Sequence, residues 1–61
     1  MKLDIINNEI IIKGSKEELE ELIEYIKKVT ESSLDKDHIH IDDLTLINKN
    51  SAIKNLIIEK D

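Results

Sequence analysis

Residues 2–13 read Lys-Leu-Asp-Ile-Ile-Asn-Asn-Glu-Ile-Ile-Ile-Lys, two short apolar runs on either side of an Asn-Asn pair. Asparagine tolerates the positive φ angles that a two-residue hairpin turn requires. The pattern therefore predicts a β-hairpin with both asparagines in its turn. In that register Ile5 faces Ile10 and Leu3 faces Ile12, and we expect these pairs to form the core face of the hairpin.

A helix is predicted directly after this hairpin. Gly14 precedes Ser15-Lys16-Glu17-Glu18, in which Ser15 can cap the first turn while Glu18 reaches back to it. We expect the helix to run to about residues 31–33. Its core-facing stripe is predicted from helical spacing to consist of Leu19, Leu22, Ile23, Ile26 and Val29. The stripe predicts that Ile26→Ala is severely destabilising, because Ile26 lies at its centre.

The second half of the chain predicts two more strands. Residues 38–42 alternate polar and apolar, which is the pattern of a half-buried strand with Ile39 and Ile41 facing the core. We expect this strand to continue through residues 44–47 after a bulge, with Leu34 tucked under the preceding connection. A last strand is predicted over residues 52–59, with Leu56 and Ile58 as core residues.

The element order β-β-α-β-β predicts a single α+β domain over residues 1–61. We expect a two-layer fold with one helix packed on a four-stranded, largely antiparallel sheet. One helix covers only one face of such a sheet. The other face would carry Ile6 and Ile11 beside Asp4 and Glu9, with Ile47 and Ile57. An apolar cluster with a charged rim usually marks an interface, so we expect a homo-oligomer formed through this face or through an edge strand.

Composition and charge limit the classes of function. The 61-residue chain carries 14 acidic residues against nine basic ones, all lysine, for a net charge of −5. An acidic chain without arginine is a poor nucleic-acid binder and suits docking onto a basic protein. The absence of cysteine favours a reducing cytoplasm, and no apolar run is long enough to span a bilayer. The opening Met1-Lys2 and the charged end predict an entire chain without a signal peptide.

Catalysis finds little support in the residue patterns. There is no cysteine, no Gly-x-Ser-x-Gly turn and no glycine-rich phosphate loop, because the chain has one glycine. Asp42 and Asp43 are adjacent, so on a strand their carboxylates point to opposite faces. The glutamates in the first half of the helix complement its dipole and are expected to form a solvated face. We predict a protein that is not an enzyme and needs no cofactor.

The histidine-bearing strand is the sharpest candidate site. His38, His40 and Asp42 share the face opposite Ile39 and Ile41. Two imidazoles and a carboxylate are ligands that zinc accepts, so a metal site is one reading. Plain surface histidines are another, and a protein interface is a third. We favour an interface and expect no tightly held metal, because only Asp42 is available as a third ligand.

The stretch His38-Ile39-His40-Ile41-Asp42-Asp43-Leu44, the helix opened by Gly14-Ser15, and the loop with Ser51 before Leu56-Ile57-Ile58-Glu59 together resemble a family of small bacterial immunity proteins. Proteins of that family are encoded beside polymorphic toxins and neutralise them. The resemblance covers most of the chain and implies an inhibitor without catalytic activity. The last loop of this chain is shorter than the family pattern leads one to expect.

These observations predict a small, acidic, cytoplasmic inhibitor that binds and masks a basic partner protein such as a toxin or nuclease. The expected contact residues are His38, His40, Asp42, Ile6, Ile11, Glu20 and Glu24. Two alternatives stay open. One is a viral protein that inhibits a bacterial immune nuclease, and the other is a sponge for a small ligand or a metal, the latter held by the two histidines and Asp42.

Overall fold

The computed structural model describes residues 1–61 and has the predicted element order. Its elements are β1 (Lys2–Ile6), β2 (Glu9–Lys13), α1 (Lys16–Thr30), β3 (His38–Asp42) and β4 (Asn55–Glu59). The α+β class is therefore confirmed. The helix α1 is too short and too polar to cross a bilayer.

The first hairpin forms in the predicted register. Asn7 and Asn8 have φ angles of 51° and 65°, as a turn that follows the twist of the strands requires. Ile5 pairs with Ile10, and Leu3 pairs with Ile12. The asparagine pair therefore determines which residues face each other in this part of the chain.

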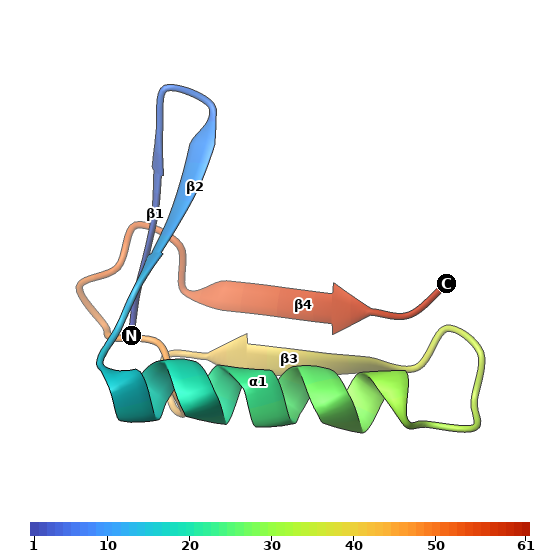
Figure 1. The fold of residues 1–61 in the computed structure, drawn as a ribbon. Coiled ribbons are helices and arrows are strands. Elements are labelled where there is room, and N and C mark those ends of the chain that lie inside the picture. The colour runs from blue at the N-terminus through green and yellow to red at the C-terminus, as the bar shows by residue number, and fades with distance from the viewer.

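The predicted four-stranded sheet is wrong. The strands form two separate antiparallel sheets, β1–β2 and β3–β4, and the first hairpin rises away from the rest of the molecule in Figure 1. The loop before β4 occupies the outer edge of β1. Ser51 Oγ accepts a hydrogen bond from the Leu3 N–H at 3.1 Å, and the Ile53 N–H donates to the Leu3 carbonyl at 3.0 Å. A third strand cannot pair where this loop already satisfies the backbone.

The core lies where the start of β1 meets β3 and the turn after it. The buried cluster consists of Met1, Leu3, Ile41, Leu46 and Ile47, with partly buried Leu22, Tyr25, Ile53, Leu56 and Ile58 packed against it. Ile41, Leu56 and Ile58 are thus placed as the alternation predicts, and Ile47 lies in the core rather than on an uncovered face. The first hairpin enters the core only through Leu3, since Ile5, Ile10 and Ile12 are exposed. The expected core face of that hairpin is therefore wrong, although its register is right.

Strand β3 ends at Asp42 instead of continuing through residues 44–47. A turn follows, closed by a hydrogen bond from the Ile47 N–H to the Asp42 carbonyl at 3.0 Å. The turn, rather than the predicted bulge, carries Leu46 and Ile47 into the core, while Leu44 stays exposed. The last strand also begins later than predicted, at Asn55.

The helix begins with the predicted capping box and is rotated relative to the prediction. The Glu18 N–H donates to Ser15 Oγ at 3.1 Å, and the Ser15 N–H donates to Glu18 Oε1 at 2.9 Å. The inward side consists of Leu22, Tyr25 and the buried Val29. The other members of the expected stripe, Leu19, Ile23 and Ile26, are exposed, and so is Leu34 in the following connection.

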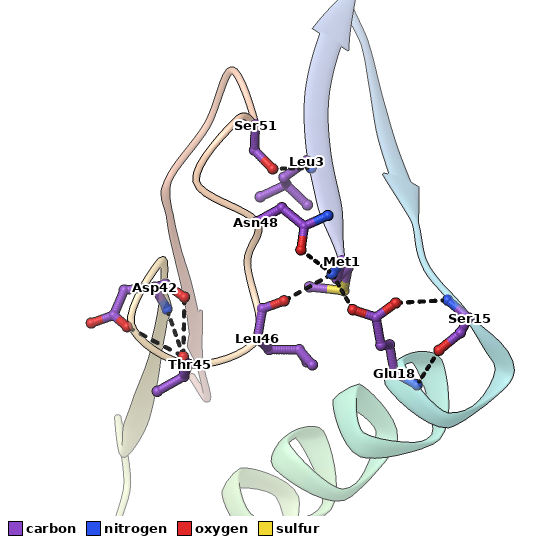
Figure 2. Close-up of polar contacts among 9 residues, drawn as sticks. All are labelled: Met1, Leu3, Ser15, Glu18, Asp42, Thr45, Leu46, Asn48 and Ser51. Carbon is purple, nitrogen blue, oxygen red and sulfur yellow. Dashed lines mark hydrogen bonds and ion pairs between the residues drawn. The ribbon is translucent and has the colours of Figure 1, made fainter.

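A partly buried polar junction joins the two halves of the molecule (Figure 2). The amino group of Met1 contacts the Glu18 carboxylate, the Leu46 carbonyl at 2.9 Å and Asn48 Oδ1 at 3.2 Å. Glu18 is the residue that also closes the helix cap. The start of β1, the first turn of α1 and the loop after β3 are therefore held together at one point.

Candidate functional site

The histidine face is formed by the outward side of the β3–β4 hairpin. Strand alternation turns Ile41 into the core and leaves His38 and His40 exposed, as predicted. The two imidazole centroids lie 5.0 Å apart in an edge-to-face arrangement at 73°. Across the ladder His40 pairs with Ile57, whose side chain is 55% exposed, and His38 pairs with Glu59. The face thus combines two imidazoles, one isoleucine and one carboxylate.

Asp42 lies on the same strand but is used by the turn (Figure 2). Its Oδ1 accepts a hydrogen bond from the Leu44 N–H at 3.0 Å and lies 3.2 Å from the Thr45 hydroxyl. The Asp42 N–H donates to Thr45 Oγ1 at 3.1 Å. No group of three histidine, cysteine or acidic side chains comes together to hold a metal ion. The set of His38, His40 and Asp42 is therefore not assembled as a metal centre.

The two isoleucines expected at the interface lie on the first hairpin. The register places Ile6 and Ile11 on one face as diagonal neighbours, since Ile6 pairs with Glu9 and Ile11 pairs with Asp4. Both are exposed. They belong to a different sheet from the histidines, so the structure separates residues that the prediction placed on one continuous surface.

The helix carries the third group of expected contact residues. Glu20 and Glu24 are exposed one turn apart on α1, and Glu24 is within 3.6 Å of Lys27. We call the exposed row Leu19, Ile23 and Ile26 the apolar stripe of α1. The sequence prediction assigned this stripe to the core and so missed it as a surface. The spacing of Leu22, Tyr25 and Val29 was the available signal, because those three share the neighbouring side of the helix.

Two carboxyl groups have shifted acidity, and both are structural. A hydrogen bond from the amino terminus, followed by one from the Ser15 backbone, lowers the pKa of Glu18. A hydrogen bond from the Ser32 side chain, followed by one from the His38 N–H, lowers the pKa of Asp37. Asp37 directly precedes β3, and its Oδ1 accepts the His38 N–H at 2.9 Å. It therefore fixes the backbone at the start of the histidine strand.

The surface as a whole is rich in exposed apolar side chains. Eleven large hydrophobic residues are exposed, whereas six hydrophobic residues are buried. No pocket opens on the molecule. The exposed apolar residues are concentrated on the first hairpin and on the apolar stripe of α1, so these two surfaces, with the histidine face, are the candidate sites for binding.

Comparison of the chain with protein-family models, curated proteins and solved structures finds no match. The resemblance to immunity proteins accordingly stays a prediction from the sequence.

Proposed function

We propose that this chain is a non-enzymatic, cytoplasmic binding protein that masks a basic partner protein, in the manner of the toxin-immunity proteins that its sequence resembles. The observation that carries the proposal is the excess of exposed over buried large hydrophobic side chains. Extended apolar surface on a small acidic protein is typical of a protein–protein interaction site.

The apolar stripe of α1 is the surface that best fits such a partner. Leu19, Ile23 and Ile26 lie at helical spacing on one side of α1 and are exposed. This arrangement of apolar anchors is the one by which a helix binds a groove on a partner. Glu20 and Glu24 lie on the adjoining side, where they would steer a basic surface toward the stripe.

The histidine face is the second contact surface in this proposal. His38, His40 and Ile57 are all exposed there, and imidazoles can donate to carbonyl or carboxylate groups of a partner. Asp42 contributes indirectly, because its carboxylate holds the turn that ends the strand.

Matched charge variants can test which surface binds. The chain is immobilised as wild type, as Glu20→Lys/Glu24→Lys, as His38→Ala/His40→Ala, and as the control Asp35→Lys/Asp61→Lys. The control makes the same change in net charge as Glu20→Lys/Glu24→Lys, but at two exposed positions away from α1. Proteins captured from a bacterial lysate are compared by mass spectrometry, and the leading candidate is purified and its affinity measured at two salt concentrations.

The proposal expects a basic protein that the wild type and the control capture and that the helix variant loses. Its affinity should fall as salt rises, because exposed charge pairs are screened. If the control also loses the protein, net charge alone attracts it. If the helix variant and the histidine variant both capture the protein as well as the wild type does, the proposal is contradicted.

A further inference from the structure

Strand β2 presents an outer edge that no other part of the chain uses. All five of its residues are exposed. None of the hydrogen bonds formed outside the ladders and the helix involves residues 9–13. In an antiparallel ladder alternate residues turn their N–H and C=O groups outward. The Leu3 backbone bonds outward to the loop, so the N–H and C=O groups of Leu3 and of its partner Ile12 point away from each other. The backbone groups of Ile12, and those of Ile10 two residues earlier, therefore point outward on the β2 side.

The outer edges of β1 and β3 are partly closed by hydrogen bonds, whereas the outer edge of β4 is open and flanked by two lysines. The loop before β4 covers β1 at Leu3. The backbone N–H groups at the two ends of β3 are taken by side chains, since the His38 N–H donates to Asp37 Oδ1 at 2.9 Å and the Asp42 N–H donates to Thr45 Oγ1 at 3.1 Å. If two copies of β4 paired antiparallel with Ile57 opposite Ile57, Lys54 of one copy would lie opposite Lys60 of the other. These devices discourage edge pairing, and β2 lacks them between its two charged ends.

The sequence of β2 is complementary to itself. It reads Glu9-Ile10-Ile11-Ile12-Lys13, with an acidic residue at one end and a basic residue at the other. A second copy placed antiparallel about Ile11 would bring Glu9 opposite Lys13, and Ile10 opposite Ile12. In this register the outward backbone groups of Ile10 and Ile12 meet, so that each such pair exchanges both of its hydrogen bonds. The same two-fold arrangement satisfies charge, side-chain and backbone complementarity together.

We propose that two copies of this chain associate through antiparallel pairing of β2 with β2, centred on Ile11. The result is a continuous sheet with the strand order β1-β2-β2-β1 across the two copies. The chain as a whole carries a net charge of −5, but the β1–β2 hairpin that makes this contact is balanced, with Lys2 and Lys13 against Asp4 and Glu9. The occupant of the β2 edge is therefore the same edge of a second molecule. This inference concerns the purified chain alone and does not depend on the proposed partner.

A cysteine placed on the two-fold axis tests the register directly. Ile11 of one copy and Ile11 of the other would form a non-hydrogen-bonded pair with their Cα atoms about 4.5 Å apart. A disulfide can bridge this distance. The chain has no cysteine of its own. Ile11→Cys is expected to form a covalent dimer in an oxidised glutathione buffer. The matched control Ile6→Cys places the thiol on the same face of β1, where antiparallel pairing of the β2 strands separates the two copies by about 20 Å. The proposal is overturned if the control cross-links as fast as Ile11→Cys.

Charge reversal tests the same contact without a covalent bond. Sedimentation equilibrium over a dilution series should show a monomer–dimer transition for the wild type. Glu9→Lys or Lys13→Glu alone places like charges opposite each other twice, and is expected to raise the dimer dissociation constant by about 5- to 30-fold. The double variant Glu9→Lys/Lys13→Glu should recover the wild-type value. A wild type that stays monomeric at every concentration, or a double variant no better than the single ones, would contradict the proposal.

Discussion

The two hairpins of this molecule are both rich in isoleucine and have opposite environments. Each consists of two five-residue antiparallel strands. The β3–β4 hairpin is covered on one face by α1 and buries Ile41 completely. The β1–β2 hairpin has no helix against it, and Ile10 near its turn is 67% exposed. Apolar alternation therefore defines a face, but a covering layer decides whether that face becomes core.

The largest expected difference between the hairpins is in the energetic cost of shortening one isoleucine. Ile41→Ala should lose about 2–5 kcal/mol, because its side chain is fully buried. That is comparable to the whole stability of a domain of this size, about 3–5 kcal/mol. Ile10→Ala should lose less than about 1 kcal/mol, because its side chain is exposed. Urea unfolding at low protein concentration measures both. Similar losses would mean that the first hairpin is covered after all.

The link between the first hairpin and the rest of the chain can be broken at Ser51. Its buried hydroxyl accepts the Leu3 N–H. Ser51→Ala should cost about 1–3 kcal/mol, since a buried donor is left without a partner. The exposed Ser33→Ala is the control and should be nearly neutral. Nuclear magnetic resonance should show the largest shift changes in β1 and in the loop before β4. Changes centred on α1 would show that the link lies elsewhere.

The rotation of α1 makes opposite predictions for two neighbouring residues. Val29 is 4% exposed and Ile26 is 39% exposed. Val29→Ala should lose about 1.5–3 kcal/mol. Ile26→Ala should lose less than about 1 kcal/mol, partly because alanine is the better helix former. Thermal and urea unfolding of the two variants measure which one loses more free energy of unfolding. A larger loss for Ile26→Ala would mean that the helix packs with the face predicted from the sequence.

The smallest expected effect concerns the junction that both halves share. The amino terminus lowers the pKa of Glu18, so this carboxylate stabilises the fold above its ordinary pKa, and the contribution is lost as pH falls through the lowered value. Glu18→Gln should therefore be less stable than the wild type at neutral pH, and the difference should vanish in acid. Unfolding curves at neutral pH and well below pH 4.5 compare the two. A difference that persists in acid would assign the effect to packing.

The local parts of this fold could be predicted because short-range chemistry determines them. Asn7 and Asn8 fix the hairpin register, Ser15 and Glu18 fix the start of α1, and alternation identifies Ile41 as buried. The arrangement of the two sheets could not be predicted. It depends on Ser51 bonding to Leu3 across 48 positions of the chain, and nothing local in the sequence indicates that contact.

The candidate sites likewise have parts that short-range patterns predict and parts that they do not. Alternation was enough to predict that His38 and His40 are exposed on one face, where their rings lie close together. It could not show that Asp42 is engaged, because the engagement comes from Thr45 in a turn that the pattern assigned to a strand. The apolar stripe of α1 was missed for a third reason. The apolar residues of the helix span more than one side, so periodicity alone did not decide which side packs inward.

Hydrogen exchange of the backbone amides tests most directly whether the two hairpins differ in this way. Exchange followed by mass spectrometry at low micromolar concentration keeps association from protecting β2. The ladder amides of β1–β2 are expected to exchange at least about tenfold faster than those of β3–β4, because a hairpin held only at its base opens locally. Equal protection of the two ladders would contradict this expectation, since both hairpins would then unfold as one cooperative unit.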